Sequence, residues 1–306
     1  MYKKLLEIAG KSRKYLSSEA CSSILHFIKN QQNRDGGFCG RNHSDSDLYY
    51  SMFAILVNDA LTDEKVEGLC EYIDSFEGGG NLDLIHLAAL SRLYASTNCR
   101  VPDSVKKSIL CSIEKYRSHD GGFHHIAKFA ENASPYGTFL AYFTYKEFEL
   151  TPPDKDPLLR ALLSSRTPDG GFSNIPESGC GTTNATVAAI ILLQEFHALP
   201  QIESDVIEQT KKDALAFLDT MSFSEGGFKA VGDAPLPDIL STATTLFAFN
   251  ELNYMVPKTF QKKIMVMIEE HWSSSGGFFG NQADTLPDCE YTFYALLALG
   301  CLNSLS

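Results

Sequence analysis

The sequence predicts an all-α protein in which six helical hairpins close into a ring, an (α/α)6 toroid. The first observation is a Gly-Gly turn that ends at positions 38, 80, 123, 172, 228 and 278. The second is an amphipathic helical pattern before each turn and a more apolar helical pattern after it. Self-similarity at such a period is typical of repeat architectures.

The turns are the most regular feature of the chain. Five of them read Gly-Gly-Phe, an acidic residue usually precedes the pair, and the second copy is degenerate. Glycine allows the sharp turn, and the phenylalanine is expected to anchor it to the core. The six turns are Gly36-Gly37-Phe38, Gly78-Gly79-Gly80, Gly121-Gly122-Phe123, Gly170-Gly171-Phe172, Gly226-Gly227-Phe228 and Gly276-Gly277-Phe278.

The segment before each turn has one apolar face. In the first repeat Cys21, Ile24, Leu25 and Ile28 follow helical spacing, with charged residues on the opposite face. The segments after the turns, such as 51–56 and 186–191, are apolar nearly all round. We therefore expect an outer ring of amphipathic helices around an inner ring of buried ones.

The predicted inner helices begin with a recurrent pair, a capping residue and a small polar residue four positions later. Side-chain oxygens at a helix start satisfy its free N–H groups. In the degenerate copy we expect His86 to take the second place. The five regular pairs are Asp47/Ser51, Ser134/Thr138, Thr182/Thr186, Asp238/Thr242 and Asp288/Thr292.

An open solenoid of the same hairpins is the alternative arrangement. Closure is favoured because the chain has no obvious capping repeats. We therefore predict a single toroid domain over 1–306, with an N-terminal extension over 1–17 and six repeats from about 18 to 305.

Composition limits the partners and the compartment. The chain has 38 acidic and 26 basic residues and a net charge of -12, which argues against a nucleic-acid-binding surface. It has no apolar stretch long enough to span a membrane. Its eight cysteines include no CxxC pair, so free buried thiols in a cytoplasmic protein are expected.

The motif Gln32-Asn33-Arg34-Asp35-Gly36-Gly37-Phe38 resembles the repeat of protein prenyltransferase β subunits and of class II terpene cyclases such as squalene cyclase. The resemblance extends over nearly the whole chain. It implies a central cavity, lined by aromatic side chains, that takes isoprenoid chains. Pro237-Asp238 and Pro287-Asp288 resemble the segments that open the last two inner helices of the β subunits.

The resemblance to prenyltransferases also implies a zinc site, but two of its three ligands are missing here. Asp238 remains, whereas Leu240 replaces the family's cysteine and Tyr291 its histidine. The diphosphate groups are sparse as well, since Lys229 is the one basic residue in its loop and Gly179 replaces a histidine. We expect no metal, no cofactor and no prenyl transfer to a protein thiol.

The resemblance to cyclases implies a carboxylic acid that protonates an alkene or an epoxide. Asp288-Cys289-Glu290-Tyr291-Thr292 has a similar layout, with Glu290 as the acid and Asp288 as its partner. Tyr291 replaces the last acidic residue of the family segment. The alternative is that Asp288 caps the helix and Glu290 interacts with its dipole. Asp47 and Asp238 are expected to be caps that border the site.

Aromatic and histidine side chains cluster at the predicted inner-helix starts. Their rings would face the cavity and hold an apolar or cationic species, or they serve packing alone. His86 either lines the cavity or is a core histidine. His124 and His125 are expected to be solvated or capping rather than metal ligands. The tyrosines are Tyr49, Tyr50, Tyr136, Tyr291 and Tyr294.

Two functions remain open from the sequence. The first, slightly favoured, is an enzyme that acts on an isoprenoid or similar apolar small molecule by acid-initiated chemistry. The second is a non-catalytic, degenerate relative that binds an apolar ligand or a protein partner.

Overall fold

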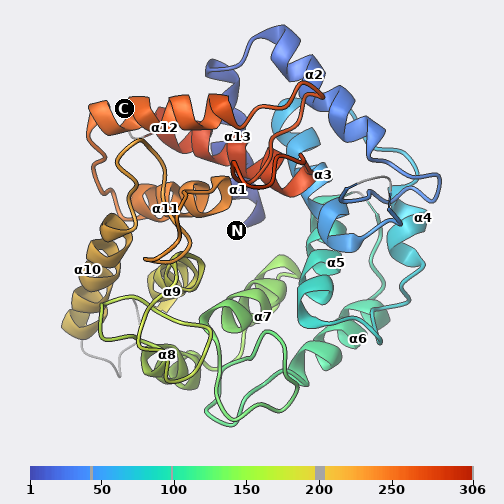
Figure 1. The fold of residues 1–306 in the computed structure, drawn as a ribbon. Helices are drawn as coiled ribbons and strands as arrows, with labels where there is room; N and C mark the ends of the chain where they lie inside the picture. The colour runs from blue at the N-terminus through green and yellow to red at the C-terminus, as the bar shows by residue number, and fades with distance from the viewer. Residues whose placement is uncertain (42–43, 98, 197–203, 305–306) are drawn as a thin grey trace.

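The computed structural model describes residues 1–41, 44–97, 99–196 and 204–304, and within these ranges the chain is helical with only isolated β-bridges. Two rings of helices alternate along the chain (Figure 1). The outer helices are α2 (Ser18–Asn30), α4 (Leu69–Asp74), α6 (Asp103–Glu114), α8 (Lys155–Ser164), α10 (Ser204–Thr220) and α12 (Lys258–Glu270). The inner helices are α3 (Leu48–Leu61), α5 (Leu84–Ser96), α7 (Pro135–Glu147), α9 (Thr183–Phe196), α11 (Ile239–Glu251) and α13 (Cys289–Ser304).

The inner ring is closed. Each inner helix contacts the next one along the chain, and α13 contacts α3. The predicted all-helical toroid is therefore confirmed, and the open solenoid is not the arrangement adopted. No helix of the described residues is long and apolar enough to cross a membrane.

One hydrogen-bonded joint links each regular turn to the following inner helix. In the first repeat the Phe38 N–H donates to Ser51 Oγ at 2.8 Å, and that hydroxyl donates to the Asp47 carbonyl at 2.7 Å. The Asp47 N–H donates back to the Phe38 carbonyl at 2.9 Å. The same bond from phenylalanine N–H to hydroxyl recurs at 2.9–3.1 Å in the pairs Phe123/Thr138, Phe172/Thr186, Phe228/Thr242 and Phe278/Thr292.

The first glycine of a turn lets it pack against the outer helix of the next repeat. Gly276 has φ +94°, and a Cβ there would lie 2.4 Å from the Ser23 carbonyl oxygen of α2. Gly226 meets the backbone of Lys263 in α12 in the same way. Because Gly276 belongs to the last repeat and Ser23 to the first, this contact also closes the outer ring.

The second repeat departs from the pattern. Asp83 caps α5, so the hydroxyl position falls on Leu87, and His86 lies one residue earlier. Our prediction that His86 occupies the hydroxyl position was therefore wrong by one residue, because Gly80 replaces the phenylalanine that marks the register elsewhere. The outer helix α4 is also short, at 6 residues.

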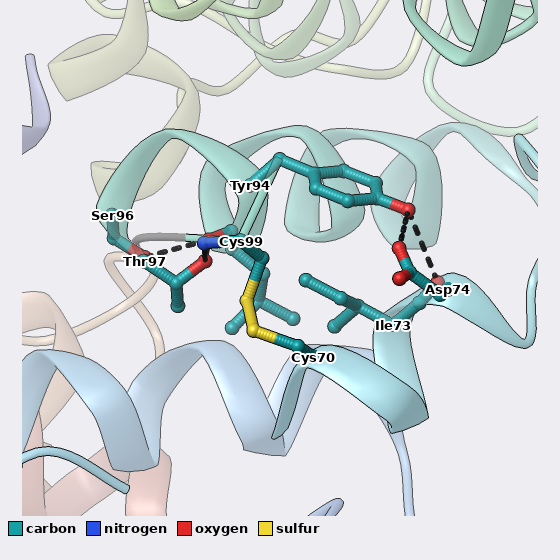
Figure 2. The surroundings of a disulfide bond; sticks show 8 residues. Cys70, Ile73, Asp74, Tyr94, Ser96, Thr97 and Cys99 are labelled. Carbon is teal, nitrogen blue, oxygen red and sulfur yellow. Dashed lines mark hydrogen bonds between the residues drawn. A yellow bond between two sulfur atoms is a disulfide. The ribbon is translucent and has the colours of Figure 1, made fainter. Parts of the chain in front are cut away.

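A disulfide between Cys70 and Cys99 joins the start of α4 to the segment after α5 (Figure 2). The Tyr94 hydroxyl donates to Asp74 Oδ1 at 2.9 Å across the same pair of helices. These two links hold the repeat that lacks the regular joint.

The expectation of eight free buried thiols was wrong. Cys70 and Cys99 are bonded, while Cys111 and Cys180 are exposed. The sequence separation of 29 residues gives no sign of the pairing, because only the antiparallel packing of α4 and α5 brings the two Cα atoms to 5.5 Å.

Residues of the expected N-terminal extension are part of the ring's interior. The helix α1 (Tyr2–Gly10) and the 3-10 turn η1 (Lys11–Lys14) pack against α13, and α1 also contacts α3. Figure 1 shows the N-terminus near the centre of the ring. Gly300 allows this approach, since a Cβ there would overlap the Ile8 carbonyl oxygen.

We predict that Thr242→Val lowers the free energy of unfolding by about 1–3 kcal/mol, because the buried Phe228 N–H loses its acceptor. Thr245→Val, one turn along the same helix, is the control. The Thr245 hydroxyl is buried with no hydrogen-bond partner among the described residues, so its removal should cost nothing. Urea denaturation measures both, and equal losses would contradict the role given to the joint.

We predict that the double variant Cys70→Ala/Cys99→Ala loses about 3–4 kcal/mol of stability, since the disulfide closes a loop of 29 residues. Cys111→Ala/Cys180→Ala, which removes two exposed free thiols, should change little. Mass spectrometry of peptides digested without reductant checks the bond directly. Detection of Cys70 and Cys99 only as free thiols would refute it.

Candidate functional site

A cavity of about 650 Å³ lies inside the inner ring. All six inner helices and α1 contribute to its lining, which is mostly apolar and rich in aromatic rings such as Phe53, Phe139 and Phe247. The volume falls in the range of small-molecule sites. Most of the polar side chains lie at the end of the cavity where the inner helices start. The end next to α1 includes Met1 and Leu5.

The structure divides the predicted site residues into two groups. The cavity is lined by Asp47, Tyr49, Tyr50, His86 and Tyr136. The other four, Asp238, Asp288, Glu290 and Tyr291, are absent from the lining.

Glu290 lies directly behind the cavity wall. Its side chain projects from the first turn of α13 and is 9% exposed. The Tyr49 hydroxyl donates to Glu290 Oε1 at 2.6 Å, and the Tyr49 ring lines the cavity. Burial raises the pKa of Glu290 to about 7, and the nearby Asp288 adds to the rise while Tyr49 opposes it. One hydrogen bond therefore connects a carboxyl that is part protonated at neutral pH to the cavity.

Asp288 has a different environment from Glu290, although it is two residues away. Its Oδ1 accepts from the Tyr291 N–H at 2.9 Å, which is an N-cap contact. Its Oδ2 accepts from Arg41 Nε at 2.9 Å, and Arg41 also pairs with Asp284. Burial raises the pKa of Asp288, and the Arg41 guanidinium opposes the rise. The carboxylate thus caps α13 and carries an ion pair.

Arg41 was missed by sequence reasoning. It follows the first turn, 247 residues before Asp288, and it lies over the Tyr291 ring at 5.7 Å. Only closure of the ring brings the first and last repeats together, so no local signal marks the contact.

His86 bridges two carboxylates at the end of the cavity where the inner helices start. Its Nε2 lies 3.0 Å from Asp47 Oδ2, and its Nδ1 lies 2.7 Å from Asp83 Oδ1. The hydrogen bond to Asp47 is the main reason that the pKa of His86 rises to about 9. Asp47 also caps α3 through the N–H groups of Tyr49 and Tyr50. His86 is consequently an imidazolium that ties the second repeat to the first.

His124 and His125 organise their own loop. His124 Nδ1 accepts from the N–H of Ile126 and of Ala127. His125 lines the cavity and pairs its Nδ1 with Ser134 Oγ at 2.8 Å. Burial lowers the pKa of both histidines.

The residues at the zinc-like positions do not fit a zinc ion. Asp238 caps α11 by accepting from the Ser241 N–H at 2.7 Å. Leu240 offers only hydrocarbon, and the phenol of Tyr291 has its pKa raised to about 12 by burial and so stays neutral. Among the described residues, no group of three or more His, Cys, Asp or Glu side chains is arranged to hold a metal ion.

The lining also contains a buried ion pair that the sequence analysis did not single out. Arg92 Nε donates to Glu147 Oε1 at 2.7 Å, with side chains 12% and 4% exposed. Arg92 lines the cavity from α5, and Glu147 is the last residue of α7. An arginine within an otherwise apolar helix was the available signal, but its partner lies 55 residues away.

The chain belongs to the family of prenyltransferase alpha-alpha toroid domains. The family profile matches residues 4–81, 78–230 and 238–306, which together cover most of the sequence. No curated protein sequence matches the chain.

Solved structures that are similar to this chain include proteins of different activity. A variant of the type II terpene cyclase MstE from Scytonema, in complex with its substrate geranylgeranyl dihydroxybenzoate, is 13% identical over 100% of this chain and 99% of that one, with a TM-score of 0.59. An inactive variant of the α-1,6-mannanase GH76A of Salegentibacter, in complex with α-1,6-mannotriose, is 13% identical over 94% and 99%, with a TM-score of 0.60. Candida albicans protein geranylgeranyltransferase-I complexed with GGPP is 18% identical over 98% and 84%, with a TM-score of 0.49. At these identities the likeness to MstE and to the mannanase concerns the fold alone.

We predict that the His86 imidazole titrates with a midpoint near pH 9. Because this folded-state pKa is raised above the unfolded value, the bridge contributes stability fully below about pH 6.5 and loses it as the pH rises through 9. NMR titration of the labelled imidazole measures the midpoint. Asp47→Asn should move the midpoint down, and an unchanged midpoint would show that Asp47 does not hold the proton.

Proposed function

We propose that this protein binds an isoprenoid-like apolar molecule in its central cavity and starts its chemistry by protonation, with Glu290 as the proton source. The observation that carries the proposal is the Glu290–Tyr49 contact, which joins a buried acid to the cavity wall. The apolar, aromatic lining supports it, and so does MstE, a protein of the same fold that binds geranylgeranyl dihydroxybenzoate.

The geometry favours transfer of the proton through Tyr49. When Glu290 is protonated, its O–H donates to Tyr49 Oη, which reverses the hydrogen bond made to the carboxylate and frees the Tyr49 O–H for the substrate. The Tyr49 O–H proton then passes to a carbon of the substrate double bond, and the Glu290 carboxyl proton passes to Tyr49 Oη in the same event. Glu290 becomes a carboxylate, Tyr49 is restored, and the other carbon of the former double bond becomes cationic. Burial and the Glu290 charge raise the pKa of Tyr49 far above its ordinary value, so a free phenolate is not an intermediate.

The lining suits a cation formed in this way. The rings of Tyr49, Phe53 and Tyr294 pack together in the cavity wall, with ring centroids of Phe53 4.9 Å and 5.3 Å from those of the two tyrosines and with the Tyr49 and Phe53 rings edge to face. Aromatic faces attract a cation in a water-poor site. The negative charge of nearby Asp288 favours the protonated form of Glu290.

A non-catalytic binding protein is the second candidate. It is favoured by the absence of Glu290 from the cavity lining and by the involvement of Asp288 in a cap and an ion pair. In that case the cavity holds its ligand unchanged. A protein partner, which stays a prediction, would recognise the ligand-bound protein.

The cytoplasmic location expected from the cysteines also stays a prediction. The Cys70–Cys99 disulfide weighs against it, because such bonds persist mainly in oxidising compartments. Whether these two cysteines are bonded or free in cells would show whether the protein resides in an oxidising or a reducing compartment.

We predict that purified protein converts isoprenoid alcohols or esters to cyclised products, detected by gas chromatography and mass spectrometry. Glu290→Gln should reduce turnover at least about 100-fold, because general-acid catalysis is lost. The same variant should keep ligand affinity within about threefold, since it preserves the shape of the side chain. Glu269→Gln, an exposed change on α12, is the control.

The pH dependence gives an independent check of the acid. The pKa of Glu290 lies near 7, so wild-type turnover should be level below about pH 6 and fall about tenfold per unit above 7. Ligand binding without turnover would favour the second candidate. Binding of α-1,6-mannotriose in place of isoprenoids would overturn both.

A further inference from the structure

The cavity wall carries hydrogen-bond donors that the protein itself does not use. Within the described residues, the hydroxyls of Tyr136 and Tyr294 have no hydrogen-bond partner, although both rings line the cavity. Several other tyrosines of the chain donate to a carboxylate, such as Tyr142 to Glu195 and Tyr145 to Glu114. Both phenols therefore leave a donor free on the cavity wall.

Arg92 adds a third donor group to this wall. Its Nε is taken by Glu147, and its Nη1 lies 3.9 Å from Met52 Sδ, a weak acceptor. No described residue accepts from its Nη2. Donors on the wall of a mostly apolar cavity find their acceptors in what the cavity holds, and a charged donor left without an acceptor is costly. These donors therefore suit an acceptor on a ligand.

The three donors line one cavity from different inner helices. Tyr294 is four residues after Glu290, so it lies on the same face of α13 about 6 Å further from the helix start. Tyr136 is the second residue of α7, as Glu290 is of α13, and Arg92 is in the third turn of α5.

We propose that Tyr136, Tyr294 and Arg92, which line the cavity from α7, α13 and α5, form an oxygen-recognition site in its wall. The inference rests on the proposed function and specifies its substrate class: an isoprenoid that carries a neutral oxygen acceptor, such as a hydroxyl, carbonyl or epoxide. A plain hydrocarbon would leave the three donors unpaired.

Charge balance selects the neutral acceptor. Glu147 neutralises Arg92, so the pair attracts a dipole but offers no net positive charge to a carboxylate or a diphosphate. Where the inner helices start, Asp47 lines the cavity and Asp83 lies beside the lining, and both pair with the single imidazolium of His86. A strongly anionic head group would meet net negative charge there.

The test compares matched ligands with the same C20 chain by equilibrium competition against a fluorescent isoprenoid. The probes are geranylgeraniol, the corresponding hydrocarbon without the hydroxyl, and geranylgeranyl diphosphate. We expect wild-type protein to prefer the alcohol to the hydrocarbon by about tenfold or more, and to bind the diphosphate more weakly than the alcohol.

The double variant Tyr136→Phe/Tyr294→Phe should reduce the preference for the alcohol over the hydrocarbon to about threefold or less, while affinity for the hydrocarbon is kept or raised. Tyr72→Phe is the matched control, because the Tyr72 hydroxyl is also buried and without a partner among the described residues but lies outside the cavity lining. It should leave the preference unchanged. Urea unfolding verifies that each variant is folded.

The outcomes separate this inference from the function on which it rests. Equal affinity of wild-type protein for alcohol and hydrocarbon, or a preference that survives the double variant, would overturn the oxygen site and leave the isoprenoid cavity intact. Tighter binding of the diphosphate would overturn the neutral-acceptor assignment. Failure of every probe to bind would refute the proposed function itself.

Discussion

The hydrogen bond from a turn phenylalanine N–H to a hydroxyl on the next inner helix is the constraint on which the structure depends. It holds the turn against the first turn of that helix in five repeats, as with Phe278 and Thr292. The phenylalanine ring is buried at the same point. Because the inner helices start where the turns hold them, the side chains at these starts converge on one end of the cavity.

The second repeat shows what replaces the joint when it is missing. Leu87 cannot accept the backbone N–H, and no phenylalanine follows the glycines. A disulfide and the Tyr94–Asp74 hydrogen bond secure this repeat from outside, while His86 and Asp47 tie it to the first repeat at the cavity. The degenerate second repeat therefore places the imidazolium of His86, in place of the hydrogen-bonded joint, beside the candidate site.

Two carboxylates on one helical turn have separate tasks because their surroundings differ. Asp288 meets a guanidinium and a backbone N–H, which suit an anion. Glu290 meets a phenol and apolar burial, which suit a neutral acid. Further along the same wall, Arg92 is neutralised by Glu147, so the cavity combines an acid, free donors and little net positive charge.

Periodicity along the chain determined the fold class, the turns and the capping pairs, since each depends on residues close in sequence. Tyr49, Tyr50, His86 and Tyr136 could be expected near the cavity for the same reason. Arg41 beside Asp288, Arg92 beside Glu147, Cys70 bonded to Cys99, and Glu290 behind Tyr49 were decided by the tertiary structure alone. Ring closure and helix packing bring these partners together across 29 to 247 residues, and no local pattern of residue types encodes such a pairing.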